Sequence, residues 1–144
     1  DMDITESLKM FFNLGILKTE IKNWQSRKDL EGRAQAHAPE RSYALGFNWT
    51  PTTNTYLAVD FTGNSSFYYS DSHNNKSKSY TLTNLNLGYV KNNWNYELWA
   101  RNIFDDYYAV RGFYFGNEAP NFIDTLYERQ GDPRHIGVSV QYDF

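Results

Sequence analysis

An all-β fold is predicted, in which antiparallel up-and-down strands form part of a transmembrane β-barrel. Three features of the 144-residue sequence predict it. Apolar and polar residues alternate with a period of two in several segments, which is the pattern of strands with one apolar and one wet face. The connections between these segments are alternately short and long. Aromatic residues gather at both ends of the segments, as they do in the girdles of membrane barrels.

The alternation predicts six strands, with tight turns at 51–54 and 91–93 and long polar connections at 24–40, 70–78 and 107–132. Pro and Asn supply the backbone geometry of the short turns. In bacterial outer-membrane barrels the short turns lie on the periplasmic side and the long loops lie outside. The six strands are expected at about 7–22, 41–50, 55–69, 80–90, 94–105 and 138–144.

Two aromatic belts are expected at opposite ends of these strands. A soluble β-sandwich would explain any single strand equally well, but the loop asymmetry and the two belts together favour a membrane. The short-turn belt comprises Trp49, Tyr56, Tyr89, Trp94 and Phe144, and the long-loop belt comprises Phe67, Tyr68, Tyr69, Tyr80, Phe104, Tyr107 and Tyr108.

The composition excludes several other classes of protein. Aromatics make up 18% of the chain, the net charge is -3 and cysteine is absent. The mean hydropathy is -0.71, and no stretch approaches the roughly 20 apolar residues of a transmembrane helix. A nucleic-acid partner is not expected, because its footprint needs clustered Lys and Arg. A disulfide framework and a thiolate metal site are excluded by the lack of cysteine.

No catalytic or metal site is expected, and no cofactor. His37, His73 and His135 lie in or beside separate connections, so no Ser-His-acid arrangement is indicated. The segment "SDSHNN" (70–75) offers oxygen ligands and one histidine, but not at a recognised metal spacing.

The last long connection, 110–130, carries more aromatic residues than a merely solvated loop needs. They can stack on a sugar or an aromatic chelate, and the arginines can hold charged groups together with Glu118. Alternatively, they fold the loop on itself, against neighbouring loops or against a partner chain. The candidate ligand-binding residues are Arg111, Phe113, Tyr114, Phe115, Phe122, Tyr127 and Arg129, and the side chains expected to face a lumen, a plug or a ligand are Glu97, Trp99 and Arg101.

Two segments near the end of the chain resemble the C-terminal end of TonB-dependent outer-membrane receptors. The motif Asn102-Ile103-Phe104-Asp105 resembles the end of that family's penultimate strand, and Gly131-Asp132-Pro133-Arg134 resembles its lead into the last strand. The segment 32–49 is similar to the family's Ala-Pro descent into a barrel strand. Gly131 and Pro133 are expected to fix a bend, where the Asp132 side chain can cap backbone amides.

The resemblance implies that residues 1–144 are the C-terminal part of a roughly 22-stranded barrel around a plug. Six strands cannot close around a plug, so the plug domain and the other strands belong to another chain or a lost segment. The implied location is the bacterial outer membrane, with the long loops extracellular and the short turns and C-terminus periplasmic. The terminal strand resembles the signal read by the barrel-assembly machinery, carried here by Val138, Val140, Tyr142 and Phe144.

The function that this resemblance implies is energy-dependent import of a scarce nutrient, with a ferric siderophore as the expected cargo. Cobalamin, a saccharide, a peptide or a haem compound would give the same strands. The implied partners are the rest of the receptor, a TonB-type energy-coupling protein acting through the plug, outer-membrane lipid and the barrel-assembly machinery. Two other readings stay open: a soluble β-sandwich that binds carbohydrate, and a structural or adhesive outer-membrane barrel.

Overall fold

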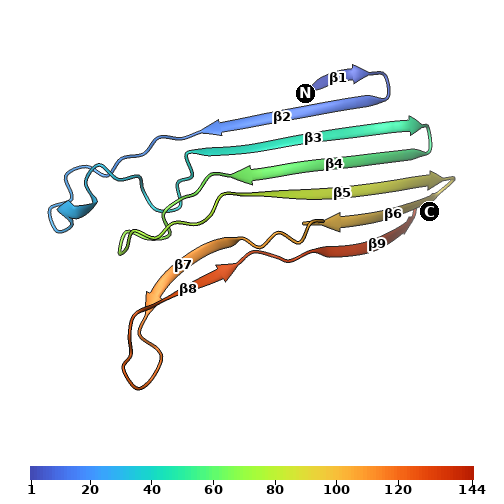
Figure 1. The fold of residues 1–144 in the computed structure, drawn as a ribbon. Coiled ribbons are helices and arrows are strands. Elements are labelled where there is room, and N and C mark those ends of the chain that lie inside the picture. The colour runs from blue at the N-terminus through green and yellow to red at the C-terminus, as the bar shows by residue number, and fades with distance from the viewer.

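The computed structural model describes residues 1–144 as one twisted antiparallel sheet from which a separate hairpin extends (Figure 1). Seven strands form the sheet in the order β1-β2-β3-β4-β5-β6-β9, and β7 pairs with β8 in the hairpin. The strands are β1 (Met2–Thr5), β2 (Leu8–Ile16), β3 (Arg41–Thr52), β4 (Thr55–Asn64), β5 (Tyr80–Lys91), β6 (Trp94–Arg101), β7 (Ala109–Phe115), β8 (Thr125–Gln130) and β9 (His135–Tyr142), with one 3-10 turn, η1 (Lys28–Leu30).

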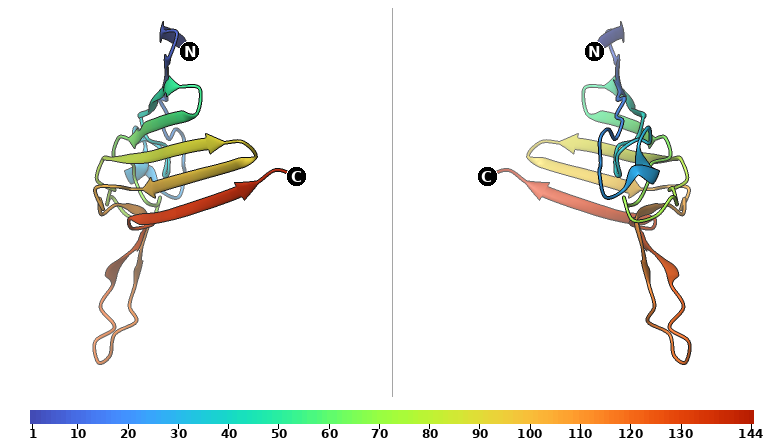
Figure 2. Two further views of the ribbon diagram at one scale, coloured as in Figure 1. Left: turned by 90° about the vertical axis from the view of Figure 1, so that its right-hand side faces the viewer. Right: turned by 90° about the vertical axis from the view of Figure 1, so that its left-hand side faces the viewer.

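Neighbouring strands of the seven-stranded sheet also follow one another in the chain, except that β6 is followed in the sheet by β9. Between those two the chain leaves the sheet to form the β7–β8 hairpin, which projects beyond the sheet (Figure 2). The short turns lie at one end of the sheet and the long connections at the other (Figure 1). None of the helical structure is long and apolar enough to cross a membrane. The predicted all-β, antiparallel, up-and-down fold is therefore confirmed.

The strand register gathers the apolar side chains on one face of the sheet. Leu57 pairs with Leu87, Leu87 with Leu98, and Leu98 with Val138, so a single apolar row crosses four strands. Cross-strand pairs of this kind are the units that stabilise a sheet. Nothing in the chain covers the face: Leu87 and Leu98 are 42% and 43% exposed, and Val138 is 71% exposed.

The buried core of the chain lies in the long connections and not on the sheet. Ile21, Leu30, Phe67 and Tyr69 are buried, and all four lie in the connections 17–40 and 65–79. Ala100 is the one buried apolar side chain of the sheet. The sheet therefore has an uncovered apolar face, while its long connections pack as a unit of their own.

Aromatic rings lie over glycines on the opposite, polar face. Phe11 pairs with Gly46, Tyr56 with Gly88, and Trp99 with Gly137. A Cβ added at Gly46, Gly88 or Gly137 would lie 2.0, 1.9 or 2.2 Å from the ring of its partner. Each ring therefore occupies the space that a side chain would need, which shields the backbone of a glycine inside a strand.

Three predicted strands extend too far toward the long connections. The strands predicted at 7–22, 55–69 and 94–105 end at Ile16, Asn64 and Arg101. Their apolar tails do not continue the sheet, because Ile21 and Tyr69 turn into the packed connections. At the third strand, Asn102 takes a left-handed φ of 48° and turns the chain. Neither β1 nor the β7–β8 hairpin was predicted.

The short-turn aromatic belt is present, with one exception. Trp49, Tyr89 and Trp94 are exposed on the apolar face, and the rings of Trp94 and Tyr142 contact each other at a tilt, with centroids 4.7 Å apart. Phe144 follows, 5.0 Å from Tyr142. Tyr56 does not belong to the belt, because it pairs with Gly88 on the polar face.

The predicted long-loop belt is wrong for five of its seven members. Phe104 and Tyr107 are 70% and 83% exposed. The other aromatics instead pack the connections against one another: Phe67 and Tyr69 are buried, Tyr68 lies under the Arg33 guanidinium, and Tyr80 contacts Tyr108.

Candidate functional site

Arg33 joins the connection 17–40 to the connection 65–79. Its Nη1 donates to the carbonyl oxygen of His73 at 2.9 Å, and its Nη2 donates to the carbonyl oxygen of Ser70 at 3.0 Å. Nη2 also pairs with Asp71 Oδ1 at 3.1 Å, and the guanidinium lies 4.3 Å over the ring of Tyr68. The Arg33 side chain is only 8% exposed. A planar guanidinium satisfies several acceptors at once, so the two connections are held as one body.

The β7–β8 hairpin is attached to this body by its polar contacts. Tyr69 Oη donates to Glu128 Oε1 at 2.6 Å, and Asn75 Nδ2 donates to Tyr114 Oη at 2.8 Å. The rings of His73 and Tyr114 meet edge to face, 4.8 Å apart. Burial, and secondarily the bond to Glu128, raise the pKa of the Tyr69 phenol above its ordinary value.

The other face of the hairpin is an exposed surface of arginine and aromatic side chains. In register, Arg111 lies opposite Arg129, Phe113 opposite Tyr127, and Phe115 opposite Thr125. Since residues two apart share a face of a strand, these five predicted ligand-binding residues lie together; we call Arg111, Phe113, Phe115, Tyr127 and Arg129 the hairpin face.

The hairpin face combines cationic and aromatic groups at short range. The Arg111 guanidinium lies 5.9 Å over the Phe113 ring, and the rings of Phe113 and Phe115 are 5.2 Å apart. Tyr127 Oη donates to Glu118 Oε1 at 3.0 Å, and that bond raises the pKa of the Tyr127 phenol. Planar guanidinium groups beside aromatic rings suit a ligand that is flat, aromatic and anionic.

The other two predicted ligand-binding residues lie elsewhere. Tyr114 faces the opposite side of the hairpin, where it packs on His73. This contact matches the alternative that aromatics fold the loop against its neighbours. Phe122 lies between β7 and β8 and is 60% exposed.

The two sequence motifs of the last strands contact each other at the rim of the sheet. Asn102 Nδ2 donates to the carbonyl oxygens of Asp106 at 3.0 Å and Asp132 at 3.1 Å, and its Oδ1 accepts from Asp106 N at 2.9 Å. Asp105 Oδ1 accepts from Arg134 N at 2.8 Å. The capping carboxylate therefore belongs to Asp105 and not to Asp132, which contributes its carbonyl.

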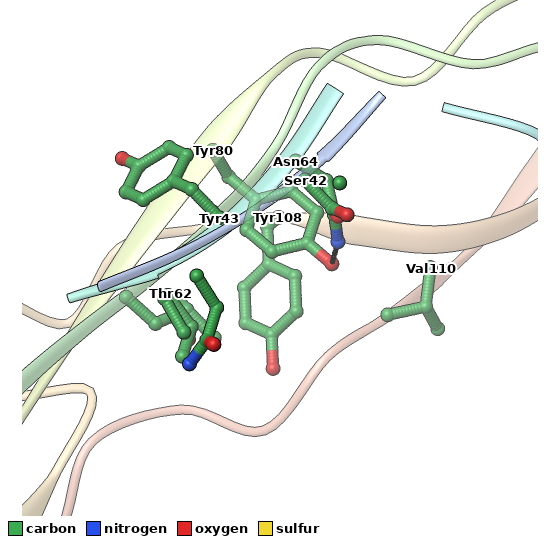
Figure 3. A pocket seen from close by; sticks show the side chains of 12 residues that line it. Ser42, Tyr43, Thr62, Asn64, Tyr80, Tyr108 and Val110 are labelled. Carbon is green, nitrogen blue, oxygen red and sulfur yellow. Dashed lines mark hydrogen bonds between the residues drawn. The ribbon is translucent and has the colours of Figure 1, made fainter. Parts of the chain in front are cut away.

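A hollow of 440 Å³ opens on the polar face beside this rim (Figure 3). The rings of Tyr80 and Tyr108 contact each other in it at a tilt of 38°, with centroids 4.6 Å apart, and Asn64 Nδ2 donates to Tyr80 Oη at 3.0 Å. The hollow offers neutral hydrogen-bonding groups and rings. Its lining residues are Asn13, Gly15, Ser42, Tyr43, Ala44, Thr62, Gly63, Asn64, Tyr80, Leu82, Tyr108 and Val110.

Sequence reasoning did not predict this hollow. The available signal was strand pairing: Asn64 ends β4 directly opposite Tyr80, which begins β5. The contact of Tyr108 with Tyr80 joins residues 28 positions apart and has no local signature.

Glu97, Trp99 and Arg101 lie on the polar face of the sheet, on β6. Glu97 Oε2 accepts from Tyr56 Oη at 2.8 Å, and Trp99 Nε1 donates to Ser139 Oγ at 3.2 Å. Arg101 forms no ion pair and is exposed. No three His, Cys, Asp or Glu side chains lie close enough together to hold a metal ion.

An antiparallel up-and-down sheet with one uncovered apolar face, one polar face and all long connections at one end defines a segment of a membrane-barrel fold. The fold is similar to that of the ferric-catecholate import receptor Fiu from E. coli K12 in its closed form, with a TM-score of 0.71 over 95% of this chain. The sequences are 20% identical, and this chain spans 19% of the length of that receptor. No protein-family model matches the sequence.

Proposed function

We propose that residues 1–144 form the C-terminal part of the barrel of a TonB-dependent outer-membrane transporter that imports a ferric siderophore. The remaining strands and the plug belong to another chain or segment, and a TonB-type protein couples energy from the inner membrane through that plug. In this arrangement the long connections are extracellular and the short turns periplasmic. The alternating segment that carries Val138, Val140, Tyr142 and Phe144 serves as the barrel-assembly signal.

The observation that carries this proposal is the uncovered apolar face. Monomeric soluble proteins rarely expose contiguous apolar patches larger than a few hundred Å², and this one crosses the sheet from β2 to β9. Burial of apolar surface stabilises by about 25 cal/mol per Å², so the face requires an apolar neighbour such as lipid. The aromatic belt of Trp49, Tyr89 and Trp94 marks where that neighbour would give way to water.

The hairpin face supports the choice of cargo. A catecholate complex of iron(III) presents flat aromatic rings and negative charge, which complement Arg111, Arg129, Phe113 and Tyr127. The similar fold of a ferric-catecholate import receptor points to the same class of cargo. We therefore propose a ferric siderophore, with the hairpin face as a first contact outside the membrane.

The membrane arrangement can be tested with single cysteines, because the chain has none of its own. Leu87→Cys and Leu98→Cys report on the apolar face, and their neighbours Asn86→Cys and Glu97→Cys report on the polar face. Each cysteine carries an NBD fluorophore attached in detergent before the protein, with every polypeptide that co-purifies, is returned to lipid vesicles, and we expect lipids with doxyl groups on their acyl chains to quench only the first pair. Water-soluble iodide is expected to quench the fluorophore at neither Leu87→Cys nor Leu98→Cys.

A soluble sandwich gives a different pattern. It predicts a folded monomer in plain buffer in which the fluorophores on both apolar-face cysteines are protected from both quenchers, and that outcome would end the membrane proposal. Mass spectrometry of the polypeptides that co-purify in mild detergent separates the transporter from an adhesive barrel. Only the transporter requires a plug-bearing partner.

The cargo can be tested by uptake of radioactive iron bound to a synthetic tris-catecholate, in cells that have no other receptor for it. We expect the double variant Arg111→Gln, Arg129→Gln to reduce uptake about tenfold or more, since each arginine supplies a charge-assisted contact. Arg27→Gln is the control, because Arg27 pairs with Asp29 in a different connection. Uptake by the double variant at the wild-type rate would exclude the hairpin face as a cargo site.

A further inference from the structure

We infer that a cleft on the apolar side of the sheet, at the end of the long connections, binds the phosphate headgroup of a membrane lipid. This inference rests on the proposed function, because it requires the apolar face to meet a bilayer. The cleft has a volume of 480 Å³; its lining includes Leu14, Arg41, Tyr43, Ser65, Ser79 and Thr81, and it is completed by Asn64 and Tyr80, which the register assigns to the polar face.

Arg41 lies at the boundary of the apolar face that is nearest to the long connections. It pairs with Ile16, and Tyr43 with Leu14, so its side chain shares the face of these apolar residues. Two backbone bonds fix its position: Ser65 N donates to the Arg41 carbonyl at 2.8 Å, and Arg41 N donates to Ser65 Oγ at 3.0 Å. The Arg41 guanidinium forms no ion pair, so its charge is available to a ligand.

Hydroxyl groups surround this charge. Tyr43 Oη and Thr81 Oγ1 are hydrogen-bonded to each other across β4, and the hydroxyls of Ser65 and Ser79 line the same cleft. Hydroxyl groups can donate to phosphate oxygens, and a guanidinium binds phosphate with two parallel N–H groups. The cleft therefore offers both parts of a phosphate site.

The floor of the cleft is apolar and continues into the uncovered face. Leu14 and Ile16 are 54% and 75% exposed, and the pair Phe12 and Leu45 follows toward the middle of the sheet. A charged head beside an apolar track is the shape of an anionic lipid. A free phosphate ion would leave that track uncovered, so we assign the site to a lipid.

The surrounding charges favour an anionic lipid over a zwitterionic one. Lys18 lies two residues beyond Ile16, on the face of Ile16 if the alternation of β2 continues, and it forms no ion pair. Glu40 is the adjacent acid. Its carbonyl accepts from Leu17 N, which continues the antiparallel pairing and directs the Glu40 side chain to the polar face.

Native mass spectrometry of the protein, with every polypeptide that co-purifies, tests this site. In nanodiscs of phosphatidylcholine with added phosphatidylglycerol, we expect one phosphatidylglycerol to be retained in preference to phosphatidylcholine. Arg41→Gln should lower that preference about fivefold, the effect of one basic residue near an anionic membrane surface. Arg41→Lys should restore part of it, and Arg27→Gln should leave it unchanged.

Three results would overturn the inference: equal retention by Arg41→Gln and wild type, equal retention of the two lipids, or displacement of the lipid by excess inorganic phosphate alone. The last result would show that the site binds dissolved phosphate ions and not the headgroup of a lipid. Failure of the proposed function is distinguishable, because it would abolish the quenching pattern of the fluorophores on the two faces. Failure of the lipid site alone would leave that pattern intact.

Discussion

Asn102 uses both ends of its side-chain amide at the rim between β6 and β9. It is 4% exposed, and its two groups bond to backbone atoms of Asp106 and Asp132. Its φ of 48° lies in the left-handed region, which asparagine tolerates better than most residues. The residue therefore combines a turn conformation with the bonds that hold the returning chain.

Asn102→Ala should destabilise the barrel rim, because it leaves buried backbone groups without partners at a cost of about 1–3 kcal/mol. Asn102→Gly loses the same hydrogen bonds, but glycine adopts a positive φ without strain. Its loss of unfolding free energy should therefore be about 1 kcal/mol smaller than that of Asn102→Ala. Thermal unfolding in detergent, followed by circular dichroism, measures both. Asn92→Gly is the control, at a turn residue with a φ of 53° and no side-chain bond; equal melting temperatures for all variants would contradict a structural role for the Asn102 amide.

Tyr69 gives the attachment of the hairpin a pH dependence. The folded state favours the neutral phenol, so the pKa of Tyr69 lies above the value of about 10 that it has in an unfolded chain. The resulting stabilisation is complete below pH 10 and is lost as the pH rises further. We expect the fluorescence anisotropy of a label at Asn117→Cys, between β7 and β8, to fall above pH 10.

The variant Tyr69→Phe should lower the anisotropy at neutral pH and flatten its fall at high pH. Tyr127→Phe is the matched control, because the Tyr127 phenol bonds to Glu118 within the segment 109–130 and not to the other connections. An identical pH profile in Tyr69→Phe and wild type would show that the Tyr69–Glu128 contact does not hold the hairpin.

Strands and connections differ in how far the sequence predicts them. A period of two is a local signal, so the positions of β3 and β5 and the apolar row through Leu57, Leu87 and Leu98 were predictable. The contacts of Arg33 with Ser70, Asp71 and His73 join residues about 40 positions apart, and no local pattern encodes them.

The candidate site shows the same division. The alternation of Arg111, Phe113 and Phe115 could have predicted that they share a face, since residues two apart do so in a strand. Tyr56 directly precedes Leu57 in the same strand. Because neighbouring residues of a strand face opposite sides, the sequence already indicates that Tyr56 lies on the polar face. The hollow around Tyr80 and Tyr108 was not predictable, because it forms only when the chain returns to the rim.

The paired rings and glycines should act as units of the strands. Gly88→Ala would place a Cβ 1.9 Å from the Tyr56 ring and displace Tyr56 from Glu97. We expect a loss of about 1–3 kcal/mol of unfolding free energy, as for other overpacked sites. In the double variant with Tyr56→Ala the losses should not add, with a coupling of about 0.5–3 kcal/mol in urea unfolding; additive losses would mean that ring and glycine act independently.

The whole molecule divides into two parts with different surroundings. The apolar face of the sheet is left uncovered by the rest of the chain, whereas the long connections bury Ile21, Leu30, Phe67 and Tyr69. If the apolar face meets lipid, as proposed, bilayer and water stabilise different parts of one chain, and a charge should cost most at the level of the hydrocarbon.

Leu85→Arg, near the middle of β5 on the apolar face, should lower the unfolding free energy in lipid vesicles by about 2–4 kcal/mol. Tyr89→Arg, in the aromatic belt, should cost about 0–1 kcal/mol, because the penalty falls with distance from the bilayer centre. Asn86→Arg, on the polar face beside Leu85, is the control. Equal costs at Leu85 and Tyr89 would contradict a membrane whose boundary lies at the belt.

The rings that lie over Gly46, Gly88 and Gly137 also shape the surface of the polar face. An aromatic side chain that stands upright on a strand projects by its full length, whereas a ring that leans over a neighbouring glycine fills the space in which that residue has no side chain. Phe11, Tyr56 and Trp99 therefore provide apolar contact without each adding a full side-chain length to the height of the polar face. If this face lines a conduit, each of these pairs widens the clearance for whatever occupies or passes through it.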